Sequence, residues 1–352
     1  MNLPVSNSRI RLSQGQLFWR EIGQGQTLVF LHGSWWTGEQ WNNVIPLLSP
    51  HHHCLIPDLL GFGESGQPQP TSSVATQVKG LAEFLAFLRV NECILVGQSL
   101  GAWVAATYAL EYPDQIKGLV LLAPEGIDAS ANSPEMANRW RGYGLLASRI
   151  PLVGWTLRSL YSLAKLFGKG ESLQTALRHR RYLRLAPEAC QLLFRRRRTE
   201  IEAELLDDRL SALTCPLELV QGEQDDSRAI ALVQSYAKAA HASITTIPGE
   251  TSKTEPWLQS VRPDLVAHQR GPVSEVMEST DDIRHQFTQT FAPRESSREH
   301  SIQPSPMKLA QSKAAKPQPQ RQSVSPSNAI PHRPLDGAIA YVIKDFIDQH
   351  RL

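Results

Sequence analysis

The sequence predicts an α/β protein built on a doubly wound, mostly parallel sheet with helices on both faces. Over the first 126 residues, short runs of Val, Ile and Leu alternate with stretches that have helical spacing of apolar residues. Continuous apolar strands between helices are typical of a parallel sheet that is covered on both faces. The chain has 352 residues, of which 41% are apolar, so it is long enough for one large core with insertions.

The predicted elements follow in order along the chain. Four apolar runs in the first part are expected to be strands, namely TLVFLHG (27–33), CLIPDLLGFGES (54–65, a strand followed by a glycine-rich loop), CILVGQS (93–99) and IKGLVLLAP (116–124). Helical spacing between them marks WNNVIPLLS (41–49), SVATQVKGLAEFLAFLRV (73–90) and LGAWVAATYALEYP (100–113). The pattern returns as a strand in LELVQGEQDD (217–226), a helix near 228–240, a strand at 243–247 and an amphipathic helix at 336–350.

Two segments interrupt this alternation and divide the chain into five parts. The first segment, 127–205, is helical and strongly basic, and the second, 250–328, has no regular spacing of apolar residues. From 301 to 328 the second segment is mostly Pro, Gln and Ser, without aromatic or acidic residues, so we expect it to be disordered. The expected parts are a first core part (1–126), a helical basic cap (127–205), a second core part (206–249), a low-complexity insert (250–328) and a closing loop and helix (329–352).

Composition excludes several classes of protein. The net charge of +2 argues against a general nucleic-acid binder, and no apolar run reaches the length of a membrane span. The four cysteines have no paired spacing, which favours free thiols in a reducing compartment over disulfides or a zinc site. The run His51-His52-His53 is expected in a solvated turn before a strand, because consecutive side chains diverge. We therefore expect no metal, no cofactor and a cytoplasmic location.

The stretch VGQSLG contains a G-x-S-x-G pattern at the junction of an apolar strand and a helix rich in small residues. A sharp turn at that junction strains the central residue and exposes its side chain above the sheet. Gly97 and Gly101 are expected because side chains there would clash with the turn. The pattern makes Ser99 a candidate nucleophile at a helix N-terminus.

A serine nucleophile needs hydrogen-bond donors for the oxyanion that develops during attack. The motif LHGSWW (31–36) ends the preceding core strand and lies where such donors are needed. The backbone N–H groups of Ser34 and Leu100 are the candidates, and His32 is expected to support the loop rather than to act as a base.

The motifs LHGSW, PDLLGFGES, VGQSLGAWVA and LVLLAP, in this order and spacing, resemble the α/β-hydrolase superfamily, with a capped, esterase- or lipase-like serine hydrolase as the form expected here. The resemblance covers about residues 15–126, 205–249 and 330–350. It implies the α/β-hydrolase fold but not the substrate, because this fold carries many activities. The resemblance also implies that epoxide hydrolases and dehalogenases have an aspartate at the elbow position. Because this chain has Ser99 there, the sequence argues against both of these activities.

The resemblance implies an acid after a later core strand, in the chain order serine, acid, histidine. Asp225 in LVQGEQDD is the preferred candidate, and its neighbour Asp226 is the alternative. Glu125, directly after LLAP, is a rival acid, although a loop carboxylate or a substrate contact is the preferred interpretation of it. Asp58 and Glu64 are expected to shape the loop PDLLGFGES.

The resemblance also implies a histidine base a few residues after the last strand, yet ITTIPGETSKTEPW (244–257) contains none. His332 lies just before the closing helix, and we expect it to be the base, displaced by the insert. Closing an eightfold longer loop costs only roughly 2 kcal/mol, so the insertion is physically tolerable. His268, His285 and His300 are weaker candidates, because each lies in sequence that cannot hold an imidazole in place.

The composition of the basic cap suggests which class of substrate the protein acts on. From Arg139 to Arg198 it contains 14 Lys or Arg residues and two acidic ones, interleaved with apolar and aromatic residues. This suits a lid over an apolar acyl pocket, or contact with an anionic membrane surface and hence a peripheral location. We expect a hydrolase of carboxylic esters or related acyl bonds. The alternatives are a C–C bond hydrolase and a non-catalytic protein that binds a membrane or partner.

Overall fold

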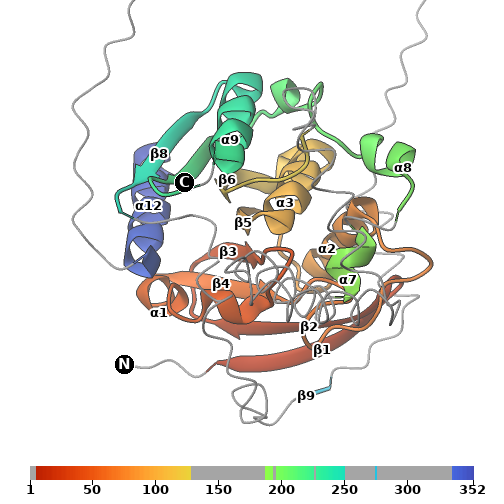
Figure 1. The fold of residues 1–352 in the computed structure, drawn as a ribbon. Helices are drawn as coiled ribbons and strands as arrows, with labels where there is room; N and C mark the ends of the chain where they lie inside the picture. Colours follow the sequence, from red (N-terminus) through yellow and green to blue (C-terminus); the bar gives the residue numbers. More distant parts are fainter. Residues whose placement is uncertain (1–4, 128–186, 193–195, 226, 250–273, 276–334) are drawn as a thin grey trace, which may run out of the picture.

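The computed structural model describes residues 5–127, 187–192, 196–225, 227–249, 274–275 and 335–352. Their strands are β1 (Ser6–Leu12), β2 (Gly15–Ile22), β3 (Gln26–Leu31), β4 (His52–Pro57), β5 (Cys93–Gln98), β6 (Ile116–Leu122), β7 (Leu217–Gly222), β8 (Ser243–Ile247) and β9 (Ser274–Glu275). These strands form one sheet in the order β8-β7-β6-β5-β3-β4-β2-β1-β9 (Figure 1).

Pairing is parallel from β8 through β4, whereas β1 and β2 form an antiparallel hairpin whose second strand pairs antiparallel with β4. The parallel strands end along one edge of the sheet. Loops after β3, β5, β6 and β7 therefore meet at the same edge, which is where ligands bind in open α/β sheets.

Helices cover both faces of the sheet. The longer ones are α2 (Val74–Phe87), α3 (Leu100–Glu111), α9 (Ser227–Ala240) and α12 (Leu335–His350). The shorter ones are η1 (Gly38–Trp41), α1 (Ile45–Leu48), η2 (Pro113–Gln115), α7 (Pro187–Cys190), α8 (Arg198–Glu202) and η5 (Leu210–Ala212). Helices α2, α3 and α9 bury their apolar faces in one cluster, and α1 and α12 bury theirs in a second cluster across the sheet (Figure 1).

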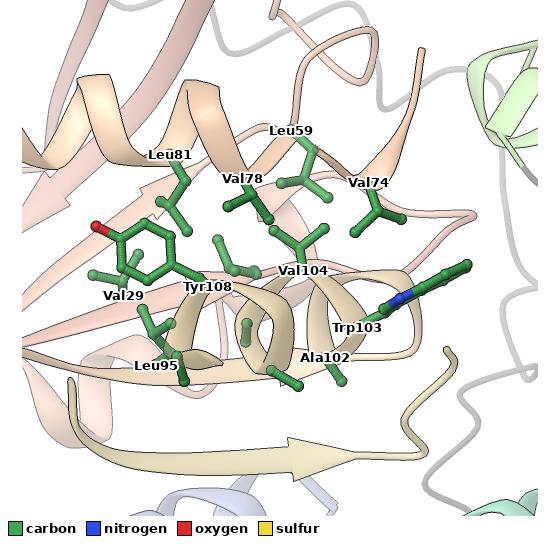
Figure 2. Close-up of a cluster of buried hydrophobic side chains, with 14 of the residues drawn as sticks. Val29, Leu59, Val74, Val78, Leu81, Leu95, Ala102, Trp103, Val104 and Tyr108 are labelled. Carbon is green, nitrogen blue, oxygen red and sulfur yellow. The ribbon is translucent and has the colours of Figure 1, made fainter. Parts of the chain in front are cut away.

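The central strands supply both clusters by alternation. In β3, Val29 and Leu31 face the helices α2 and α3, whereas Leu28 and Phe30 face α1 and α12. Figure 2 shows the first cluster, in which side chains of α2 and α3 meet over the sheet. Each fully buried Leu, Val or Phe contributes about 1.5–3 kcal/mol, so this two-sided burial is the main force that holds the sheet and its loops in place.

The fold class expected from the sequence is confirmed, and most of the helices and strands predicted within residues 1–126 and 206–249 lie where they were expected. The hairpin β1–β2 was not anticipated, because buried residues alternate with more exposed ones in β1 and the buried apolar run of β2 spans only Leu17–Trp19. The stretch 41–49 forms only the end of η1 and the short α1 instead of one helix.

The prediction that His51, His52 and His53 form a turn is wrong for two of them. His52 and His53 lie in β4, where their backbones pair with β3, and only His51 lies in the turn. The His53 Nε2 atom lies 2.8 Å from a Glu21 oxygen on β2, so this side chain joins neighbouring strands.

Most of the expected cap and insert lies outside the described residues. Helices α7 and α8 belong to the last part of the expected cap, and β9, from the expected insert, pairs in parallel with β1. Among the helices that the structure describes, none combines the length and the apolar character needed to cross a membrane.

Candidate active site

Ser99 occupies a strained turn between β5 and α3, as the G-x-S-x-G pattern predicted. Its backbone has φ 52° and ψ −114°, a conformation that non-glycine residues rarely adopt. A side chain at Gly97 would place Cβ 2.6 Å from the Gly101 carbonyl oxygen, and one at Gly101 would place Cβ 2.3 Å from the Leu31 carbonyl oxygen. Both glycines are therefore required by close backbone contacts, and together they hold Ser99 at the carboxyl edge of the sheet.

The turn places Ser99 at the N-terminus of α3. Its carbonyl oxygen accepts hydrogen bonds from the N–H groups of Ala102 and Trp103, which closes the first helical turn. The N–H of Leu100, the first residue of the helix, has no acceptor within the helix. This end of the helix also carries the positive end of its dipole, so it favours negative charge beside Ser99.

The loop after β3 packs directly against the elbow. A Cβ added at Gly33 would lie 3.5 Å from the Ser99 Cβ, so the loop backbone passes close to Ser99. Ser34 is completely buried, and its Oγ lies 3.4 Å from the Ser99 Oγ. Of the two candidate oxyanion donors, Leu100 directly follows Ser99 at the start of α3, and Ser34 contacts Ser99 from the loop after β3.

Two glutamines connect this loop to the elbow, and sequence reasoning missed both. The Gln40 Oε1 accepts a hydrogen bond from the Gly33 N–H at 2.9 Å, and the Gln40 Nε2 donates to the Gln98 Oε1 at 2.6 Å. Gln98 directly precedes Ser99 and is buried. The pair is 58 residues apart in sequence and has no motif of its own, so no sequence signal could have found it.

His32 supports the loop, as expected. It is completely buried, its Nε2 accepts the Leu59 N–H at 2.9 Å, and its Nδ1 lies 2.9 Å from the Gly33 carbonyl oxygen. Nδ1 must therefore carry the proton. Burial lowers the pKa of His32, the Asp58 charge opposes this in part, and a neutral imidazole fits both hydrogen bonds.

Asp58 shapes the next loop, also as expected. Its carboxylate accepts the N–H groups of Gly38 at 2.7 Å and Glu64 at 2.9 Å, and an Arg20 nitrogen lies 3.4 Å away. Asp58 is fully buried. These bonds fix the loop behind the oxyanion candidates and leave Asp58 no direct part in chemistry at Ser99.

Glu125 is the acidic side chain that meets the nucleophile candidate. The Ser99 hydroxyl donates to Glu125 Oε1 at 2.9 Å, and the Ser34 hydroxyl donates to Glu125 Oε2 at 3.4 Å. The carboxylate thus bridges the two serines that follow β5 and β3. The sequence suggested a rival acid, a loop carboxylate or a substrate contact for Glu125, but not this direct contact with Ser99.

The backbone of Glu125 is held from both sides. Its N–H donates to the Ser99 carbonyl oxygen at 3.3 Å, and its carbonyl oxygen accepts the hydroxyl of Tyr236 on α9. Tyr236 is fully buried, and burial raises the pKa of its hydroxyl well above the ordinary value, so this donor keeps its proton. The backbone of Glu125 is therefore fixed beside Ser99, and its carboxylate is held there by the two serine hydroxyls.

Asp225 lies in the turn after β7, at the same edge of the sheet. Its Oδ2 accepts the Gly222 N–H at 2.9 Å, its own N–H donates to the Gly222 carbonyl oxygen at 3.1 Å, and its side chain is buried. These bonds orient the carboxylate within the turn. The alternative acid, Asp226, lies outside the described residues.

The structure leaves the proposed base untested. His332 and the weaker candidates His268, His285 and His300 all lie outside the described residues. Within the part of the chain that the structure describes, no cluster of three or more His, Cys, Asp or Glu side chains has the arrangement of a metal site.

The parallel sheet, the strained serine turn and the loop packed against it define the architecture of α/β hydrolases. Residues 28–269, more than half of the chain, match the model of the alpha/beta hydrolase family, so this protein belongs to that family. The family inferred from the sequence is thereby confirmed.

Relatives in the family carry different activities. The chain is 36% identical over 106 residues to a haloalkane dehalogenase of Bradyrhizobium diazoefficiens, a match that covers 30% of this chain and 34% of that protein. It is 35% identical over 128 residues to a pimeloyl-[acyl-carrier protein] methyl ester esterase of Vibrio vulnificus, covering 36% of this chain and 45% of that protein. The chain spans about a third of the length of the first of these relatives.

Solved structures agree on the fold. A hydrolase from Pseudomonas aeruginosa superimposes with a TM-score of 0.53 at 22% identity, covering 72% of this chain and 94% of that one. At this identity the likeness concerns the fold alone, and the activity must be argued from the site.

Proposed function

We propose that this protein is a serine hydrolase that cleaves a carboxylic ester or a related acyl bond of an apolar substrate. The observation that carries the proposal is the conformation of Ser99, held at φ 52° between two glycines that tolerate no side chain. Backbone strain of this kind persists only where the surrounding structure enforces it, and it concentrates at functional sites.

In the proposed reaction, the Ser99 Oγ attacks the carbonyl carbon while His332 takes the hydroxyl proton. The N–H groups of Ser34 and Leu100 donate to the oxyanion, and the N-terminus of α3 favours its charge. His332 then protonates the leaving alcohol. Water, deprotonated by His332, hydrolyses the acyl-enzyme, and Asp225 orients the imidazole throughout.

Several features support an ester over other substrates of the family. The elbow residue is a serine, whereas an aspartate is implied for dehalogenation and epoxide opening. One of the matched relatives is a methyl ester esterase. The preference for an apolar substrate rests on the apolar and aromatic residues of the expected cap.

The test is labelling with a fluorescent fluorophosphonate, which reacts with an activated serine. Wild type is compared with Ser99→Ala, His332→Ala and Asp225→Asn. The control is Ser235→Ala, which removes a hydroxyl that donates to the Ala231 carbonyl oxygen within α9. Esters of increasing acyl length are then offered to the wild type, with hydrolysis followed by release of the alcohol.

We expect labelling of the wild type and the control, none in Ser99→Ala, and a rate about 10²–10⁴-fold lower in His332→Ala, the usual contribution of a general base. A folded wild type that neither labels nor hydrolyses any ester would overturn the proposal. Full labelling of His332→Ala would leave Ser99 as nucleophile but remove His332 as its base.

A further inference from the structure

The Glu125 carboxylate has no role in the mechanism above, yet it touches the nucleophile. It accepts hydrogen bonds from Ser99 at 2.9 Å and from Ser34 at 3.4 Å. Its side chain is only partly buried, so a substrate at Ser99 can reach it. Among the described residues, no Lys, Arg or His forms an ion pair with it.

A negative charge at this position opposes the reaction of an ordinary ester. When the Ser99 Oγ attacks the carbonyl carbon, negative charge develops on the former carbonyl oxygen. This oxyanion then lies close to the negative charge of the Glu125 carboxylate. Near a protein surface such repulsion is substantial, because the effective dielectric constant is far below that of water. An anionic substituent on the substrate would add a third charge.

Acylation also removes a hydrogen-bond donor from the carboxylate. In the free protein Glu125 Oε1 accepts a hydrogen bond from the Ser99 hydroxyl, whereas in an acyl-enzyme Oγ is an ester oxygen and has no proton to donate. The carboxylate then lacks a partner at that oxygen, which is costly at a partly buried position. A substrate that brings its own N–H or O–H donor restores the bond.

We propose that Glu125 is a specificity-determining residue that selects esters with an ammonium or another hydrogen-bond donor beside the scissile carbonyl and disfavours anionic ones. This inference rests on the proposed function, with Ser99 as nucleophile. It narrows the substrate class to esters that combine an apolar body with a cationic or donor group near the bond that breaks.

The test uses ester pairs that match in shape and differ in charge. On the acyl side, methyl 3-aminopropanoate is compared with methyl butanoate, and methyl hemisuccinate is compared with methyl 4-methylpentanoate. On the alcohol side, choline butanoate is compared with 3,3-dimethylbutyl butanoate. The kcat/KM of each ester is measured for the wild type and for Glu125→Gln, in which the amide keeps an acceptor for Ser99 but loses the charge.

Glu92→Gln is the matched control. Glu92 precedes β5 at the strand end opposite to Ser99, is exposed, and pairs with Lys117 at 2.7 Å. Glu92→Gln removes the same charge from the protein without changing the site. The kcat/KM ratios of this variant for the charged and neutral esters should therefore equal those of the wild type.

In the wild type we expect the cation to raise kcat/KM about tenfold over its neutral partner in at least one pair, and the anion to lower it by a similar factor. Glu125→Gln should bring both ratios close to one. Ratios of one in the wild type, or ratios that Glu125→Gln leaves unchanged, would overturn the inference. Loss of all ester hydrolysis in a folded Glu125→Gln would also overturn it, because Glu125 would then serve the proton transfer itself.

Fluorophosphonate labelling of the same wild-type sample separates this inference from the proposed function. Labelling without any charge preference removes the role of Glu125 and leaves the serine hydrolase in place. Absence of both labelling and hydrolysis removes the serine hydrolase, and the specificity proposal falls with it.

Discussion

The hydroxyl of Ser99 donates a hydrogen bond to the carboxylate of Glu125 at 2.9 Å, across 26 residues of sequence. The contact follows from strand register: in the parallel pair β5–β6, Gln98 lies opposite Leu122, so the residues that follow both strands leave the sheet side by side. The Glu125 N–H also donates to the Ser99 carbonyl oxygen at 3.3 Å. Two strand ends are thus joined by backbone and side chain at the proposed nucleophile.

The elbow glycine Gly101 should not tolerate a methyl group. An added Cβ would lie 2.3 Å from the Leu31 carbonyl oxygen and 2.6 Å from that of His32, and neither backbone can move without shifting β3. We expect Gly101→Ala to lower the free energy of unfolding by about 3 kcal/mol and to slow fluorophosphonate labelling. Urea unfolding and labelling rates provide the measurement.

Gly80 in α2 is the matched control, because it is also a buried helical glycine. A Cβ there would lie 2.9 Å from the Leu60 Cδ1, the end of a side chain that can shift, and the next nearest atoms are at ordinary contact distance. Alanine also gains about 1 kcal/mol of helix propensity over glycine. Gly80→Ala should therefore stay within about 1 kcal/mol of the wild type. Equal losses in the two variants would contradict the steric explanation.

Gln40 should position the loop that carries Ser34. Gln40→Met keeps the length of the side chain but removes the acceptor for the Gly33 N–H and the donor to Gln98. We expect a loss of about 2 kcal/mol in stability, since buried polar groups lose partners. Labelling should become about tenfold slower, the equivalent of about 1.4 kcal/mol in the barrier.

Gln40→Glu separates positioning from packing. It retains an acceptor for the Gly33 N–H and should recover most of the labelling rate. If Gln40→Met labels as fast as the wild type, the glutamine bridge has no influence on the site, whatever it contributes to stability.

Glu188 should make stability fall as pH rises. It is buried against Gly61 and accepts the Ser72 hydroxyl, and burial raises the pKa of its carboxyl above the ordinary value. In the pH range between the pKa of the unfolded chain and that of the folded protein, the folded state holds the proton more tightly. Its stabilising contribution is therefore present below the unfolded pKa and is lost as pH rises through the folded pKa.

Glu188→Gln should accordingly raise the melting temperature at pH 7–8, with a difference from the wild type that shrinks toward pH 4. Glu204→Gln should have the opposite effect on stability. The Glu204 carboxylate pairs with Arg196 at 2.6 Å and accepts the first N–H groups of α2, so its charge is stabilising. Glu204→Gln should lower the melting temperature at pH 7. A destabilised Glu188→Gln at neutral pH would refute the assignment.

The described thiols should be inert in the folded protein. Burial raises the pKa of Cys54 and Cys93 to about 12 and that of Cys215 to about 11. Only the thiolate reacts, so its population at pH 8 is very small. In a Cys190→Ser background, we expect no reaction with a disulfide reagent before denaturant is added and three thiols after it. Rapid labelling under native conditions would show that one of these sites opens.

The elements could be predicted because their signals are local. Apolar runs marked the central strands, glycine spacing marked the elbow at Ser99, and both follow from steric limits on neighbouring residues. The half-buried hairpin β1–β2 was missed, since its register depends on a partner strand rather than on its own apolar pattern. Asp225 lies in its predicted turn, and the role of His332 stays a prediction.

The sequence by itself determined the fold class, the strained turn at Ser99 and the supporting roles of His32 and Asp58, because each depends on residues a few positions apart or on a motif with one geometry. Only the tertiary structure decided what surrounds the serine. The bridge from Gln40 to Gln98 and the contact from Ser99 to Glu125 join residues on separate strand ends. Such pairs come together only when the sheet sets its strand order and register, so no local pattern encodes them.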